Sequence, residues 1–471
     1  MRDVVLVPVR SLALTTLCAV LLWAAVRAQT TFESPVFFPV PASPSAVAVV
    51  NVDLDGDKDI VVLTASGIRV LVNDGSGSFA ARDQGGLWTH IAHDVAAADL
   101  DRDGDADLTV AMSGIGVNGF PDGTGRVGVL FNRGDGVFAP AVLYNSPGST
   151  FSVAAADLNG DGFQDVASTG NSFRASVFLN DGVGTLTRIG DFGNGYTSRA
   201  IKAGDLDGDR DIDLAFANPG ISRISVLRNV GDGTFPSFAF YEAGDNCNDV
   251  VMADTDRDGD LDLASANYHS RNISVLANRA DGSFAPQVVY PAGSFPVDLT
   301  EADFNGDQWP DLAVADRDAN AVLILLNNGG GSYGTASAMA VGRGPIQVET
   351  GDLNGDQRPD LVVLNAGSQQ LAVLFWSANG TAPPPPPPPP PAVQIVLTIA
   401  GQTAKPRSVD LRWTGATASS VTVTRDGTTI AETPNDGQFT DVLAARGTYV
   451  YSICQQGPAA CSNQVTVRFP R

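Results

Sequence analysis

The chain of 471 residues is expected to be all-β, because most of it divides into seven similar units, each with room for four short strands. Two recurring features define the units. An acidic segment of nine residues, strictest at 99–107 (DLDRDGDAD), starts again at six other places, mostly about 49 residues apart. A Gly-rich turn that begins with Asn and ends with a large apolar residue, as at 132–138, keeps the same spacing. Four strands per unit in seven units predict a seven-bladed β-propeller.

The N-terminus has the pattern of a secretory signal peptide over residues 1–28. Arg2 and Arg10 precede or border an apolar run from Leu12 to Val26, and cleavage is expected after Ala28. The run is shorter than the roughly 20 residues of a membrane-spanning helix, which disfavours the alternative of an uncleaved anchor. We therefore expect a secreted, extracellular or cell-surface protein, with the periplasm as an alternative, and no transmembrane segment after cleavage.

The N-terminal strand is expected to close the propeller, which spans residues 29–380. The seventh unit supplies a third strand at Leu371–Phe375 but runs into prolines without a fourth. Residues Pro35–Val40 resemble the fourth strand of the second unit, Ala139–Tyr144. Pairing of the first strand with the last unit would protect sheet edges, whereas an open solenoid, the alternative, would leave them exposed.

The third unit illustrates the strands. They are expected at Val153–Ala156, Val166–Ser168, Ser176–Leu179 and Leu186–Ile189. The acidic segment then joins the first two strands and the Gly-rich turn joins the last two, so both lie at the same end of the unit.

The acidic segments have the composition of calcium loops. Positions one, three, five and nine are Asp or Asn in all seven copies, and Ca²⁺ takes roughly 6–8 oxygen ligands. The carbonyl of position seven can add another ligand. An EF-hand needs an acidic twelfth position, which these loops lack. Up to seven structural Ca²⁺ ions are therefore expected. The expected ligands, loop by loop, are Asn51, Asp53, Asp55, Asp57 and Asp59; Asp99, Asp101, Asp103, Asp105 and Asp107; Asp157, Asn159, Asp161, Phe163 and Asp165; Asp205, Asp207, Asp209, Asp211 and Asp213; Asp254, Asp256, Asp258, Asp260 and Asp262; Asp303, Asn305, Asp307, Trp309 and Asp311; Asp352, Asn354, Asp356, Arg358 and Asp360.

The acidity of the chain is concentrated in these loops. They contain 28 of the 52 acidic residues, and the formal net charge is −23. A surface of this kind repels nucleic acid, which is therefore not an expected partner.

The acidic loops and the Asn…Gly-x-Phe turns together resemble the FG-GAP/VCBS repeats of the integrin α-subunit propeller and of many bacterial secreted proteins. The resemblance covers about residues 32–379. It implies that Ca²⁺ binds the loops on the lower face of the propeller and that partners dock on the upper face. Asn51 departs from the family pattern at the first ligand, and Arg210, Gln308 and Gln357 replace its usual Gly.

A proline-rich linker and a small β-sandwich follow the propeller. Residues 381–392 include nine consecutive prolines, which predict a stiff polyproline II spacer. Residues 393–471 alternate apolar and polar positions, as in Val421–Thr424 and Tyr449–Ile453, and resemble a fibronectin type III or immunoglobulin-like module. Cys454 and Cys461 are candidates for a disulfide across its last hairpin. Cys247 is expected to be a buried, unreactive thiol.

The connections expected on the upper face carry the candidate ligand-binding residues, for which a packing role is the alternative. These residues are Trp88, Phe120, Phe173, Tyr196, Tyr268 and His269.

No catalytic group is expected. The chain has three histidines and no nucleophile elbow, phosphate-binding loop or zinc signature. We expect a monomeric, non-enzymatic binding or adhesion protein whose partner is an extracellular protein or glycan. The alternative is a lectin or a carbohydrate-active lyase or hydrolase that uses the face opposite the acidic loops.

Overall fold

A computed structural model describes residues 32–85, 90–115, 121–377, 396–404, 407–414, 420–426, 428–434, 438–443, 448–455 and 465–469. The chain divides into two compact units, with the division between Pro383 and Pro384. The described elements are strands, apart from one 3-10 turn, η1 (Pro219–Ile221).

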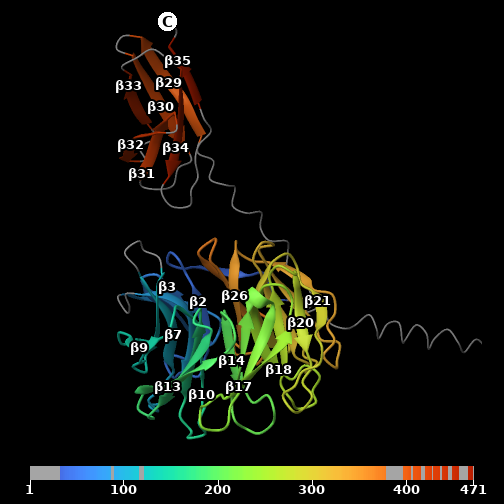
Figure 1. Cartoon of the computed structure of the whole chain (residues 1–471). Coiled ribbons are helices and arrows are strands. Elements are labelled where there is room, and N and C mark those ends of the chain that lie inside the picture. The colour runs from blue at the N-terminus through green and yellow to red at the C-terminus, as the bar shows by residue number, and fades with distance from the viewer. Residues whose placement is uncertain are drawn as a thin grey trace, which may run out of the picture. The chain divides into compact units, whose positions relative to one another are not determined.

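The first unit consists of seven antiparallel sheets of four strands each (Figure 1). In each of the first six blades the strands pair in chain order. Their bounds are β2 (Ala46–Val50), β3 (Asp59–Thr64), β4 (Gly67–Asn73) and β5 (Phe79–Gly85); β6 (Ile91–Ala98), β7 (Asp107–Ile115), β8 (Pro121–Leu130) and β9 (Val142–Ser146); β10 (Thr150–Ala156), β11 (Asp165–Gly170), β12 (Arg174–Asn180) and β13 (Leu186–Gly193); β14 (Ala200–Gly204), β15 (Asp213–Asn218), β16 (Arg223–Arg228) and β17 (Ser237–Glu242); β18 (Cys247–Ala253), β19 (Asp262–Asn267), β20 (Asn272–Leu276) and β21 (Val288–Pro291); β22 (Pro296–Ala302), β23 (Asp311–Asp316), β24 (Ala321–Leu325) and β25 (Ser337–Ala340).

The seventh blade joins the two ends of the propeller sequence. It contains β26 (Pro345–Gly351), β27 (Asp360–Asn365), β28 (Gln370–Leu374) and the N-terminal strand β1 (Val36–Pro39). β1 runs antiparallel to β28, with Val36 opposite Val373 and Pro39 opposite Gln370. The prediction that the N-terminal strand completes the last blade is therefore confirmed.

The first strands of the blades form the inner wall of the ring. Each contacts the next, from β2 through β6, β10, β14, β18 and β22 to β26, and β26 in turn contacts β2. Val47 and Ile60 of the first blade share one apolar cluster with Val362 and Leu371 of the last. The first and last blades therefore pack together as other neighbouring blades do.

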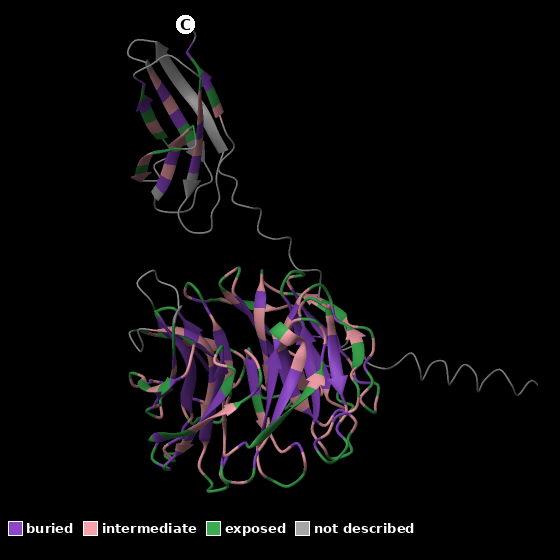
Figure 2. Cartoon of the chain, in the orientation of Figure 1, coloured by how far each residue is buried: buried purple, intermediate pink, exposed green. Residues whose placement is uncertain are grey.

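Burial follows the position of a strand within its blade (Figure 2). The six residues of β3 and of its equivalents in the other blades, except the longer β7, are all buried. A second strand has other sheets against both of its faces, which explains why its small polar residues are buried together with its apolar ones. The fourth strand β17 is mostly exposed, because it lies at the outer edge.

Five inner strands carry a register irregularity of the β-bulge type directly before a polar residue. That residue accepts a hydrogen bond from a backbone N–H of the next blade. For example, Oδ2 of Asp298 accepts from the N–H of Val348 at 2.7 Å, and Oε1 of Gln347 accepts from Val47 at 2.8 Å. We call these five residues the inner belt. They are Asp94, Ser152, Asp249, Asp298 and Gln347.

A bulge re-aims a side chain, and here it aims one at the neighbouring sheet. The belt therefore fastens one blade to the next. β2 and β14, the two inner strands without an irregularity, pair with their second strands in continuous register.

The second unit contains two sheets. β29 (Val396–Ala404), β30 (Arg407–Thr414) and β33 (Gln438–Val442) form one, and β31 (Ser420–Arg425), β32 (Thr428–Pro434), β34 (Thr448–Gln455) and β35 (Val465–Arg468) form the other. Val409 and Leu411 of the first sheet share a buried cluster with Val421, Tyr451 and Ile453 of the second. A core between two sheets is the arrangement of a β-sandwich.

Candidate functional site

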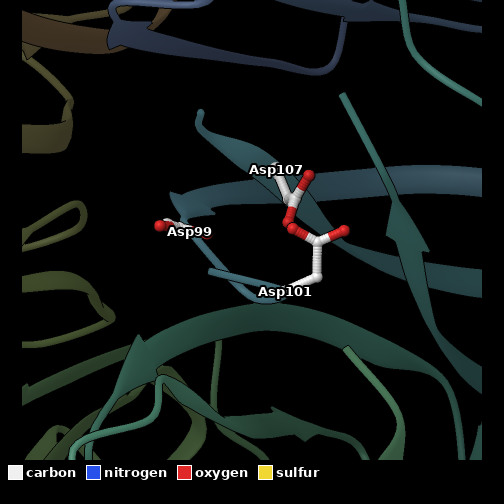
Figure 3. Close-up of side chains that lie close together, drawn as sticks. All are labelled: Asp99, Asp101 and Asp107. Atoms are coloured by element: carbon white, nitrogen blue, oxygen red, sulfur yellow. The ribbon is translucent and has the colours of Figure 1, made fainter. Parts of the chain in front are cut away.

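The acidic loops occupy equivalent places in all seven blades. Each joins the first strand of a blade to the second, so residues 99–107 lead from β6 into β7. Figure 3 shows Asp99, Asp101 and Asp107 of this loop, with the carboxyl groups of Asp101 and Asp107 turned toward each other. The Gly-rich turns join the third strand to the fourth and therefore lie at the same lower end.

The aspartate at position nine of each loop fixes two backbone segments. Oδ2 of Asp107 accepts the N–H of Leu100 at 3.0 Å, and Oδ1 accepts the N–H of Asn132 at 2.8 Å. The aspartate is buried in every blade, and the same two bonds recur in every blade. The seven residues are Asp59, Asp107, Asp165, Asp213, Asp262, Asp311 and Asp360.

The asparagine that begins each Gly-rich turn extends this contact to the neighbouring blade. The side-chain amide of Asn132 donates to the carbonyl of Ala106 in its own loop and to that of Val52 in the preceding loop, at 3.1 and 2.8 Å. In the seventh blade Trp376 takes this place, and its Nε1 donates to the carbonyl of Phe304 at 2.8 Å. We call the position-nine aspartates and these turn residues the blade lock. It ties each acidic loop to the ring of blades.

Each loop is wound tightly around its first residue. The carboxylate of Asp99 accepts the N–H of Arg102 at 2.7 Å and that of Gly104 at 3.2 Å. Positions four and six both have positive φ in every loop, and at least one of them is Gly. Arg210, Gln308 and Gln357 adopt φ of 77°, 71° and 63°, so the loops without Gly at position six keep the same shape.

Gly104 allows a test of this backbone requirement, because an added Cβ would have no atom within 4 Å and its φ is +97°. We expect Gly104→Ala to lower the free energy of unfolding by about 1–2 kcal/mol through backbone strain alone. The measurement is chemical denaturation of the full chain. Gly85→Ala is the control, since Gly85 lies at the end of β5 with its nearest neighbour 3.5 Å from the added atom. Equal losses in the two variants would contradict the strain argument.

The donor atoms of the loops fit a hard divalent cation. Carboxylate oxygens of Asp99, Asp101 and Asp107 lie within 4.8 Å of one another, as do those of two further trios: Asp205, Asp207 and Asp213; Asp254, Asp256 and Asp258. Oδ1 atoms of Asp53, Asp105 and Asp207 are buried without a hydrogen-bond partner. A buried carboxylate oxygen with no donor is costly unless a cation faces it. Oxygen atoms alone, several of them anionic, are the ligand set that Ca²⁺ takes.

The electrostatics of the loops also favour a bound cation. Burial, together with the neighbouring carboxylates of Asp103, Asp101 and Asp99, raises the pKa of Asp105 to about 6. Burial raises the pKa of Asp107 to about 7 although two backbone N–H groups oppose the shift. The loops therefore hold more negative charge at neutral pH than their own geometry stabilises.

The loop of the fourth blade already contains a protein cation. The guanidinium of Arg228 forms an ion pair with Asp207, at position three of that loop, and Arg228 also donates to the carbonyl of Asp281 at 2.7 Å. The equivalent residues of the other blades are uncharged, for example Val72 and Phe131. The loops are therefore alike in backbone but different in charge.

The upper face, opposite the loops, carries the aromatic residues named above. Phe173 is 52% exposed, and its ring lies 5.6 Å from that of Tyr196. Tyr268 is half-buried, with its ring 4.7 Å from that of Phe295, and His269 lies 3.7 Å from Asp245. Trp88 and Phe120 lie outside the described residues. The described residues of the predicted ligand face thus lie in connections of the third, fourth and fifth blades.

Two adjoining cavities open near these residues. A central cavity of about 410 Å³ is lined by inner strands and contains Asp94, Asp249, Asp298, Glu349 and Lys202. An upper cavity of about 390 Å³ lies among the connections of the upper face. The two share Arg199, Asn248 and Val297.

The central cavity places one lysine among several carboxylates. Burial alone would lower the pKa of Lys202, but the carboxylates of Asp249, Glu349, Asp298 and Asp94 outweigh it and raise that pKa. Burial and the carboxylates of Asp249 and Glu349 raise the pKa of Asp298 well above its ordinary value. Lys202 lines the central cavity and its side chain is exposed there, although inner strands surround it, so the cavity is open to solvent. A permanently protonated lysine is not a nucleophile.

Glu349 predicts a pH dependence of stability. Burial raises its pKa from 4.5 to about 7, so its ionisation in the folded protein opposes folding as the pH rises through that range. We expect Glu349→Gln to leave stability unchanged at pH 4.5 and to increase it at pH 8, on the order of 1–2 kcal/mol after allowing for water in the cavity.

Thermal denaturation of both proteins at pH 4.5, 6 and 8, in constant calcium, measures this effect. The difference between the two proteins removes the pH dependence of groups that Glu349 does not influence. Asp298 and Lys202, whose pKa values Glu349 raises, contribute to the difference. A difference that does not change with pH would contradict the assignment.

The remaining expectations fall on other parts of the chain. Cys247 is fully buried, which confirms that part of the prediction, and burial raises the pKa of its thiol to about 12, which disfavours the reactive thiolate. Residues 1–28, the polyproline linker and Cys461 lie outside the described residues, as does the side chain of Cys454. The disulfide thus stays a prediction. Within the described ranges, no helix combines the length and apolar character needed to cross a membrane.

Comparison with known proteins agrees with the repeat and with the fold. The family described as FG-GAP-like repeat matches residues 29–110, 117–168, 157–216, 205–265, 254–314 and 303–363. No curated protein sequence matches the chain. The crystal structure of BBS1N in complex with ARL6DN, soaked with lead, is similar with a TM-score of 0.54 and 12% identity, over 74% of this chain and 98% of that chain. The WD40 β-propeller domain of Doa1 is similar with a TM-score of 0.50 and 12% identity, over 75% and 99%. Such low identity shows the β-propeller fold alone.

Proposed function

Because the chain belongs to the FG-GAP-like repeat family, we propose that it is an exported β-propeller, stabilised by calcium, that binds an extracellular partner without chemical turnover. The observation that carries this proposal is the separation of two kinds of site. The lower ends of the blades hold clustered acidic oxygens, whereas the upper ends hold an open cavity lined by polar and aromatic side chains.

Calcium has a structural role in this proposal. The Asp and Asn side chains at positions one, three and five would hold it together with position seven. The bound ion would give a partner to the buried oxygens of Asp53 and Asp207 at position three and of Asp105 at position seven. The bound ion supplies positive charge between acidic groups that otherwise repel one another. The aspartate at position nine already accepts two backbone N–H groups, which fix the loop. The remaining lone pairs of its carboxylate are available to the ion.

Export is part of the same proposal. The pattern of residues 1–28 predicts a cleaved leader, and calcium is plentiful outside the cell. N-terminal sequencing of protein recovered from the medium of the expressing host tests this directly. A mature chain that begins at Gln29 supports export, and a chain that remains in the cytoplasm with its N-terminus intact contradicts it.

The binding role is tested with arrays of glycans and of matrix proteins, probed with the full chain in calcium. Retention on the array with no change in the size of the bound polymer supports a binding protein. Silence on both arrays contradicts a glycan or matrix partner.

A carbohydrate-active enzyme is the second candidate, because the central cavity contains carboxyl groups with raised pKa, Glu349 among them. Against it, the carboxylates of Asp94, Asp249 and Asp298 already accept backbone N–H groups of the neighbouring blade. Chromatography of oligosaccharides incubated with the protein separates the candidates, since shorter products would establish the enzyme.

A further inference from the structure

The upper cavity is positively charged in an otherwise acidic chain. Its lining residues are Arg199, Pro219, Gly220, Asn246, Asn248, Tyr268, Val297 and Arg317. Both charged residues among them are arginines, and no carboxylate lines the cavity, although the chain has a formal net charge of −23.

Neither arginine is neutralised by a neighbour. Within the described part of the chain, the side chains of Arg199 and Arg317 form no hydrogen bond or ion pair, and both are exposed. Asp316 precedes Arg317 but is fully buried, and its carboxylate accepts the N–H groups of Ser294 and Phe295 at 2.6 and 2.9 Å. Asp245, beside Asn246, accepts from Ser222 and faces His269. Asp249 and Asp298 line the central cavity, where each accepts a backbone N–H of the next blade. Asp318, which follows Arg317, is exposed and does not line the upper cavity.

Two uncharged polar groups complete the cavity. The amide of Asn248 and the hydroxyl of Tyr268 are half-buried, and neither has a hydrogen-bond partner among the described residues. The ring of Tyr268 is held in place by that of Phe295, at 4.7 Å. On the other side, Tyr196 lies against Gly220, where an added Cβ would be 2.3 Å from its ring. Tyr268 is therefore the aromatic residue that lines the cavity, and Tyr196 packs behind the lining residue Gly220.

We propose that the upper cavity binds an anionic sugar unit, with the carboxylate of a uronic acid between Arg199 and Arg317. A guanidinium group binds a carboxylate through two parallel hydrogen bonds, which makes Arg the residue suited to this recognition. Asn248 and the Tyr268 hydroxyl are placed to bond sugar hydroxyl groups, and the ring of Tyr268 offers an apolar surface. A volume of about 390 Å³ lies in the range of small-ligand pockets. This assignment rests on the proposed binding role of the upper face and names its ligand class.

The test uses the full chain in saturating calcium and isothermal titration with short uronic-acid oligomers, galacturonate and glucuronate, and with their neutral methyl esters. We expect at least one acidic oligomer to bind, its ester to bind at least tenfold more weakly, and affinity to fall as salt rises. The double variant Arg199→Gln with Arg317→Gln should lower affinity at least tenfold. Arg174→Gln is the matched control, since Arg174 is an exposed arginine at the upper end of the third blade that does not line the cavity.

Melting temperatures of all variants establish that they are folded. Three results would overturn the assignment: no acidic oligomer binds, the ester binds as well as the acid, or the double variant binds like the wild type. If the arrays detect a neutral glycan or a protein whose binding the double variant retains, the binding function stands and the cavity assignment fails.

Discussion

Replacing Asp107 by alanine is expected to lower the free energy of unfolding by about 2–5 kcal/mol, because it leaves the buried N–H groups of Leu100 and Asn132 without an acceptor. Each such donor costs roughly 1–3 kcal/mol. The loss should appear with calcium and with chelator, since these bonds need no metal. The measurement is chemical denaturation of the full chain in both conditions.

Asp103→Ala is the matched control in the same loop. Asp103 is exposed at position five, and its carboxylate accepts a single local N–H, that of Asp105 at 3.1 Å. It is expected to destabilise the protein in calcium and to have little effect in chelator. If Asp107→Ala were also harmless in chelator, the blade lock would not carry the stability assigned to it.

The sequence predicts the loops and blades because both repeat with a fixed spacing. Strand and turn chemistry are local, so the third unit could be divided correctly into β10, β11, β12 and β13 from residues within it. The pairing of β1 with β28 was also predictable, since the seventh unit has no fourth strand of its own and β1 precedes the first unit.

The contacts of the blade lock could not be predicted in full, because the partners of its aspartates and turn residues are set by tertiary structure. The amide of Asn73 donates to the carbonyl of Leu353 in the seventh blade, at 2.8 Å, a contact that exists only after the ring has formed. Trp376 in place of the asparagine was equally hidden. A repeat pattern shows that a residue recurs, but it does not show what the residue touches.

The inner belt has a signal in the sequence. Asp249, Asp298 and Gln347 are spaced 49 residues apart, and each directly precedes an apolar residue of its first strand. A polar residue at a fixed place in repeated buried strands predicts a contact between repeats. Lys202 does not recur at a fixed spacing along the chain. Its position among carboxylates of other blades therefore becomes visible only in the folded ring.

Removal of calcium is expected to lower the melting temperature of the propeller while leaving its strands intact at room temperature. A ligand that binds only the folded state stabilises it by about 2.7 kcal/mol per site at a hundredfold excess over Kd, so even partial occupancy of seven loops gives a large effect. The strands should persist because the blade lock and the inner belt join neighbouring blades without metal.

Thermal denaturation before and after dialysis against EGTA, with metal content determined by mass spectrometry, measures the effect. Circular dichroism at room temperature should be unchanged, and added Ca²⁺ should restore the melting temperature. Mg²⁺ is the control, and it should restore less, because it requires shorter bonds and near-octahedral geometry. An unchanged melting temperature after verified metal loss would show that the acidic loops do not use calcium for stability. Loss of the β-sheet signal on chelation would instead show that the blade lock cannot hold the ring by itself.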